Sequence, residues 1–144
     1  MAAAAATIFV GATGAQAAGP QVPDNCKVAW APYAAAGGDP VQPGGPYVEK
    51  GAQESSQVIT VTITKVAAGK VWGQSHFTGA TYNNITNFEG RLVNSDTFTF
   101  AISTGSRLRL KQFDDGLAGY IDSVVWNTCS PVVLRRVVSP HAQK

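Results

Sequence analysis

Charge is scarce in this sequence: Asp, Glu, Lys and Arg make up only 14% of its 144 residues, and the net charge is +2. No run of Lys and Arg is longer than the pair Arg135-Arg136. Nucleic-acid-binding domains carry much denser basic clusters, so we predict no nucleic-acid partner. The longest apolar stretch, residues 2–10, is too short to cross a bilayer as a helix, so we also predict no transmembrane span.

Cysteine and histidine are equally sparse, with two residues of each. Neither a C-x-x-C pair nor a His-rich spacing accompanies them, so we predict no metal site and no cofactor. In an oxidising compartment Cys26 and Cys129 would form a disulfide that ties the N-terminal segment to the last strands. The alternative is a pair of buried free thiols.

The N-terminal residues 1–17 have the pattern of a signal peptide. An apolar stretch is followed by small residues and by Ala15-Gln16-Ala17, the A-x-A pattern that precedes signal-peptidase cleavage. No Lys or Arg precedes the apolar stretch, and an Ala-rich helix packed on the domain is the alternative. Glycines at positions 11, 14 and 19 disfavour that helix. We therefore predict a secreted or periplasmic protein.

Residues with strand and turn preferences are abundant, among them 15 glycines and many Thr, Ser and Asn. Residues 18–50 are predicted to be an irregular segment that contains a short strand at residues 27–33, ending at Pro32, and a Pro/Gly-rich linker at residues 37–46. Residues 51–138 are predicted to form the folded domain, and residues 139–144 a frayed tail.

Alternation of apolar and polar residues runs through this domain from about Ser56. In the strand at residues 57–66, Ile59, Val61 and Ile63 alternate with threonines. Six or seven such strands follow one another at intervals of about ten residues, with a bulge or kink expected at Gly90. We predict an all-β, antiparallel up-and-down meander that closes into a small barrel, because closure buries one face and removes the free edges. A two-sheet sandwich, the alternative, needs longer crossover connections.

Five short segments carry a family resemblance: GKVWG (residues 69–73), FEGRL (88–92), GSRLRL (105–110), DGLAG (115–119) and LRR (134–136). Over residues 71–136 the chain resembles small, mostly uncharacterised bacterial secreted domains with a calycin-like (lipocalin-like) barrel. The resemblance implies a barrel fold, and it implies no particular ligand. The G-x-W opening of lipocalins and the biotin-binding pattern of avidins are both absent.

The stretch RLRLKQFDDGLAGY (residues 107–120) brings acids and cations close together in sequence. Asp114-Asp115-Gly116 is typical of a hairpin turn, and adjacent carboxylates on an extended chain face apart, so an acid/base pair is disfavoured. Arg107, Arg109 and Lys111 share one strand face, opposite two leucines. We predict that they form a solvated outer face. The alternative is a surface that binds anionic lipid headgroups or acidic glycans.

The only strand histidine, His76, is the candidate catalytic base. Its neighbour Ser75 faces the opposite way, and no G-x-S-x-G motif occurs. An enzyme would have to pair His76 with Asp96 or Asp122, as a small hydrolase, isomerase or cyclase. We assign no catalytic residue and favour a protein that is not an enzyme.

Aromatic residues near strand ends indicate a binding site. We predict a barrel mouth lined by Trp72, His76, Tyr82 and Tyr120 that takes a small apolar or aromatic ligand, a glycan or another cell-envelope component. Aromatics that only fill the core are the competing interpretation. The overall prediction is an exported β-barrel binding protein. An enzyme or a structural protein that assembles into a larger array are its alternatives.

Overall fold

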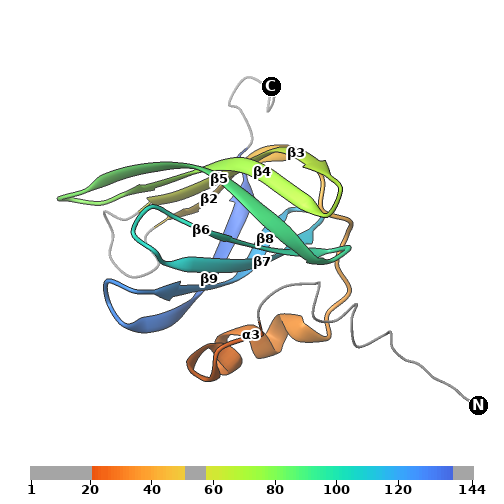
Figure 1. The fold of residues 1–144 in the computed structure, drawn as a ribbon, viewed down its shortest axis with the longest axis horizontal. Helices are drawn as coiled ribbons and strands as arrows, with labels where there is room; N and C mark the ends of the chain where they lie inside the picture. Colours follow the sequence, from red (N-terminus) through yellow and green to blue (C-terminus); the bar gives the residue numbers. More distant parts are fainter. Residues whose placement is uncertain (1–20, 51–57, 138–144) are drawn as a thin grey trace, which may run out of the picture.

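Eight antiparallel strands close into a barrel in the computed structural model, which describes residues 21–50 and 58–137 (Figure 1). Each strand pairs with the next, and β2 pairs with β9 to close the ring. This confirms the predicted all-β, up-and-down barrel. Residues 1–17 and 139–144 lie outside the described residues. The strands are β2 (Gly44–Lys50), β3 (Val58–Ala67), β4 (Lys70–Thr78), β5 (Asn83–Asn94), β6 (Thr97–Ala101), β7 (Arg107–Phe113), β8 (Gly116–Ser123) and β9 (Thr128–Arg136).

The barrel interior is filled by the apolar side of each alternating strand. On β3, Ile59, Val61 and Ile63 are buried while the threonines between them are less buried. Successive strand residues point to opposite faces, so this alternation separates the core from the outer surface. Stacked aromatic rings contribute to the same core, and the centroids of Phe88 and Phe100 lie 3.9 Å apart.

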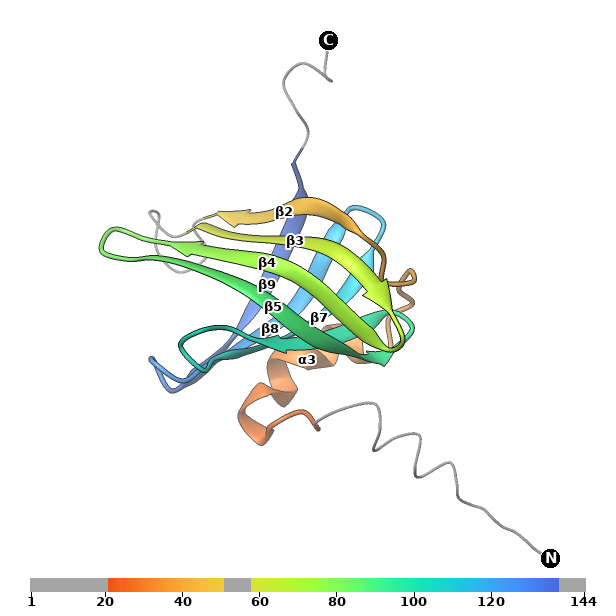
Figure 2. The ribbon, with the colours of Figure 1, turned by 45° about the horizontal axis from the view of Figure 1, so that its top comes forward.

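A helix, α3 (Lys27–Ala34), occupies the segment that was predicted to be a short strand, and a 3₁₀ turn, η1 (Asp24–Cys26), precedes it. The helix lies outside the barrel against β8 and β9 (Figures 1 and 2). Its Trp30 contacts Tyr120 edge-on, with ring centroids 6.1 Å apart, and its Tyr33 contacts Phe113 at the same centroid distance. Residues three apart share one side of a helix, so tertiary contacts explain why helix prevails over the local strand pattern and Pro32.

The Pro/Gly-rich segment does more than link α3 to the barrel. The backbone N–H of Asp39 donates to the carbonyl oxygen of Gln112 at 2.9 Å. The backbone N–H of Val41 donates to the carbonyl oxygen of Ser95, also at 2.9 Å. These bonds fasten the segment to two hairpins at one end of the barrel, and Val41 is buried in the core. The strand β2 then begins at Gly44, inside the segment that was predicted to be irregular.

The predicted distortion of β5 is displaced by a few residues. Gly90 pairs in regular register with Val71 on β4, whereas the register with β6 shifts between Leu92 and Asn94. The irregularity therefore faces β6.

The cations of β7 point outside the barrel as predicted, but the prediction of a solvated face is wrong for two of them. Only Arg107 is exposed, whereas Arg109 and Lys111 are 5% and 4% exposed because α3 covers them. The Lys111 ammonium donates to the carbonyl oxygens of Tyr33 and Ala36 at the C-terminal end of α3. A cation at this end satisfies carbonyl groups that the helix leaves unpaired and complements the helix dipole.

We expect Lys111→Met to lower the free energy of unfolding by about 2–3 kcal/mol, because it leaves partly buried carbonyl oxygens at the end of α3 without their charged donor. The matched control is Arg107→Met, which removes an exposed cation from the same face of the same strand and should change stability by less than about 0.5 kcal/mol. Urea unfolding of both variants measures the difference. Equal losses would mean that the lysine does not secure the helix.

Candidate functional site

The two ends of the barrel differ in how they are filled. At the end crossed by residues 38–43, the interior holds Tyr47 and Gln112, both of them fully buried. The Gln112 side-chain amide donates to the Tyr47 hydroxyl at 3.3 Å and to the Phe113 carbonyl oxygen at 3.1 Å. This end is therefore closed by packed side chains, and the turn Asp114-Asp115 lies there.

The opposite end opens into a cavity of about 590 Å³. Its wall is mainly apolar, and hydroxyl and amide groups lie among the apolar side chains. Small-molecule sites in proteins have this size and composition. The residues that line the cavity are Glu49, Ile59, Phe77, Tyr82, Asn84, Ile102, Thr104, Ser106, Ile121, Ser123, Val125, Trp126, Thr128, Ser130, Pro131 and Val132.

Several polar groups of this wall hold the rim in place. The Ser106 hydroxyl oxygen accepts from the Val124 backbone N–H at 3.0 Å, and the Ser123 hydroxyl oxygen accepts from the Trp126 N–H at 3.1 Å. The Ser103 hydroxyl donates to the Asn84 side-chain oxygen at 2.7 Å. These bonds connect the β6–β7 loop to β5 and tie the β8–β9 turn to the rim, so they give the rim a defined shape.

Apolar side chains project from the rim into solvent. Val124, Val125 and Trp126 are consecutive in the β8–β9 turn and are 63%, 63% and 72% exposed. Val125 and Trp126 also line the cavity, as does Tyr82 from the β4–β5 hairpin. Contiguous exposed apolar residues are unusual on a protein surface unless they bind something. Their position at the cavity entrance extends the apolar wall outward.

Glu49 is the one formally charged residue of the cavity wall, counting the residues that the structure describes. It follows Val48, which pairs with Arg135 where β2 meets β9. The Glu49 carboxylate accepts a hydrogen bond from the backbone N–H of Val133 on β9 at 2.8 Å. Burial raises the pKa of Glu49 above its ordinary value of 4.5, and the hydrogen bond from Val133 opposes part of this change.

The structure places one of the four predicted binding residues in the cavity wall, Tyr82. Trp72 and His76 lie on the outer side of β4, alternating with residues buried in the barrel. There the Lys65 ammonium lies 4.9 Å from the Trp72 ring centroid, and His76 Nε2 lies 2.6 Å from the Asn83 side-chain oxygen. Tyr120 is buried beneath α3. Ligand binding by these four residues stays a prediction.

The residues considered for catalysis are not gathered in one place. His76 lies near the β4–β5 hairpin, opposite Ile85, whereas Asp96 lies in the turn after β5, 3.9 Å from the Lys111 ammonium. Asp122 belongs to β8, which is not adjacent to β4. Asp115, in the turn at the closed end, pairs with Arg135 at 2.6 Å.

On the outer surface, Lys70 lies 3.0 Å from the exposed Glu89 carboxylate. The hydrogen bond and charge of this lysine lower the pKa of Glu89. Glu89 is therefore a surface acid with its own counter-ion.

Sequence reasoning missed Glu49 and most of the hydroxyl-bearing rim. The available signal was Tyr47-Val48-Glu49, in which the first and third residues share a face. The glycines and prolines just before it obscured the strand. Trp126, which lines the cavity, was not among the predicted binding residues.

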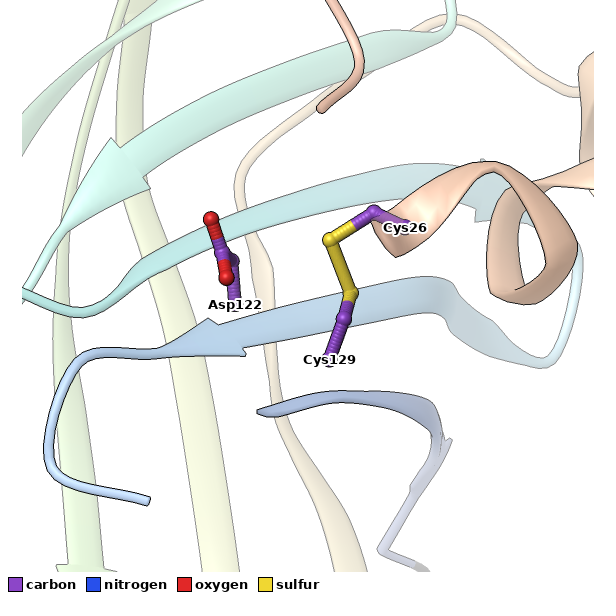
Figure 3. A group of neighbouring side chains, drawn as sticks. All are labelled: Cys26, Asp122 and Cys129. Atoms are coloured by element: carbon purple, nitrogen blue, oxygen red, sulfur yellow. A yellow bond between two sulfur atoms is a disulfide. The ribbon is translucent and has the colours of Figure 1, made fainter. Parts of the chain in front are cut away.

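One cluster has the composition of a metal site. Asp122 and the two cysteines place a ligand atom each within 4.8 Å of one another (Figure 3). The sulfur atoms of Cys26 and Cys129 are, however, bonded to each other at 2.10 Å. Metal binding by cysteine requires thiolates, so the disulfide form offers only the carboxylate. The bond joins the start of α3 to β9.

Comparison with protein-family models, with curated proteins and with solved structures found no match to this chain. Among the described residues, no helix has the length and apolar character needed to span a membrane.

Proposed function

We propose that this protein is an exported, non-enzymatic binding protein that holds a small, largely apolar molecule in the open end of a calycin-like barrel. The observation that supports this most directly is the cavity of about 590 Å³ with its apolar wall. Ligand-binding cavities commonly fall between roughly 300 and 1,000 Å³ and combine apolar walls with a few polar groups. Burial of the ligand's apolar surface would supply the binding energy.

Export is supported by two independent features. The first is the signal-peptide pattern of residues 1–17, and the second is the disulfide between Cys26 and Cys129. Disulfides persist in oxidising compartments, which is where a secreted or periplasmic protein would be found. The resemblance to small bacterial secreted barrels points the same way.

Binding is favoured over catalysis by the orientation of His76. The enzyme alternative depended on this residue as a base inside a pocket. His76 instead lies outside the barrel wall, next to Asn83. A general base must reach the substrate proton directly or through one water molecule, which this position does not allow for a ligand in the cavity.

A fluorescence titration with the apolar dye Nile red tests the proposed site. We expect Trp126→Ala to weaken dye binding about tenfold, because a tryptophan at a cavity entrance is a typical hot spot. The matched control is Trp72→Ala, which removes a half-buried tryptophan from the outer face of β4 and should leave binding unchanged.

Two results would contradict the proposal. The first is an intact protein that does not bind the dye at all. The second is an equal loss in the two tryptophan variants, which would place the dye elsewhere on the surface. Native mass spectrometry of protein purified from its source is the complementary measurement, because a co-purifying ligand would reveal its chemical class.

A further inference from the structure

We infer that the ligand carries a positively charged amine on its apolar body, and that Glu49 binds this amine inside the cavity. The inference rests on the proposed function and specifies the class of molecule that the same cavity would take. Its starting point is the position of Glu49, whose carboxylate is the single charged group among the described residues of the wall.

The geometry of Glu49 leaves it able to bind a ligand. One carboxylate oxygen, Oε2, accepts from the Val133 N–H at 2.8 Å. An ionised carboxylate offers about four acceptor positions on its two oxygens, so this bond occupies a fraction of its capacity. The backbone bond also fixes the direction of the side chain. Glu49 is thus a preorganised acceptor on the cavity wall.

The charge of Glu49 lacks a matching cation among the described residues that line the cavity. The arginines at the end of β9 have other partners: Arg135 pairs with Asp115 at 2.6 Å, and Arg136 lies over the Tyr47 ring with 5.6 Å to its centroid. Burial disfavours the ionised form of this carboxylate and raises its pKa. A ligand ammonium would supply the missing charge.

Other head groups would gain less from the same position. A hydroxyl could donate one hydrogen bond to the carboxylate but would bring no charge. A carboxylate would be repelled by it. An ammonium adds Coulombic attraction to its hydrogen bond with the carboxylate, so the expected order of affinity is amine, then alcohol, then acid.

Displacement of Nile red by octylamine, octanol and octanoate at neutral pH tests the inference, since the three probes have apolar chains of seven or eight carbons and differ mainly in their head groups. In the wild-type full-length protein we expect octylamine to bind roughly tenfold more tightly than octanol, and octanoate to bind least tightly. In Glu49→Gln, which keeps an acceptor for the Val133 N–H, octylamine and octanol should bind about equally. Octanol affinity should change less than about twofold.

The control variant is Glu89→Gln, which removes the same charge from the outer surface and should keep the preference for amine. Wild-type protein that binds octanol and octylamine equally would overturn the inference while leaving the proposed apolar site intact. A preference for octylamine that survives Glu49→Gln would also overturn it. If neither the dye nor any of the three probes binds, the proposed function itself fails, and the inference fails with it.

Discussion

Removal of the Cys26–Cys129 disulfide is expected to lower the free energy of unfolding by about 4–5 kcal/mol in the chain-entropy model, because the bond links residues 103 apart in sequence. The loss should exceed that of an ordinary core substitution. The bond also holds α3 against β8 and β9, so its removal should let water reach Arg109 and Lys111. Urea unfolding of the Cys26→Ser/Cys129→Ser double variant measures the effect.

Reductant provides the control for this experiment. It should lower the urea midpoint of the wild-type protein toward that of the double variant, and it should leave the double variant unchanged. Intact mass before and after reduction shows whether the bond was present. A wild-type protein whose mass shows full reduction but whose midpoint does not move would contradict the expected role of the bond.

The second large effect is expected from Gly119→Ala, which should lower the free energy of unfolding by at least about 3 kcal/mol or prevent folding. Gly119 lies on β8 opposite Leu110 of β7. A Cβ atom at this position would overlap the carbonyl oxygen of Arg109 and lie 3.1 Å from the Leu110 Cα atom. These are backbone atoms of a paired strand, so a side-chain rotation cannot relieve the overlap. Glycine within a strand often marks such a close approach of two backbones.

The matched substitution is Gly37→Ala, where no neighbouring atom lies within 4 Å of the added Cβ. Its effect should stay within about 0.5 kcal/mol. Thermal or urea unfolding of the two variants, with circular dichroism to confirm the barrel, gives the comparison. Similar stabilities for the two would show that β7 and β8 separate without cost at this point.

The barrel was predictable because its determinants are local. Alternation in β3, β6 and β7 marks the buried side of each strand, and Asp-Asp-Gly marks the turn between β7 and β8. The helix α3 was not predictable in this way. Its contacts with Phe113 and Tyr120, and the disulfide from the preceding Cys26 to Cys129, involve residues distant in sequence, whereas the local pattern around Pro32 favours an extended chain.

The distinction between local patterns and contacts distant in sequence applies to the candidate site as well. Alternation with the buried Val71 and Phe77 indicates that Trp72 and His76 belong outside, so the sequence already contained evidence against placing them in the cavity. Assigning Glu49 to the cavity required knowing that β2 exists and that it closes the ring through its pairing with β9. Since that pairing joins the two ends of the barrel sequence, no local window shows it.

The closed end carries the strap of residues 38–43 and the packed Tyr47–Gln112 pair, while three described hairpin connections, residues 79–82, 102–106 and 124–127, surround the open end. The contacts that close the barrel and the proposed ligand site thus belong to different parts of the chain. Substitutions or insertions in these three connections could redirect the cavity toward new molecules while the opposite end keeps the barrel folded. This separation makes the protein a suitable starting scaffold for engineered receptors of small amphiphilic compounds.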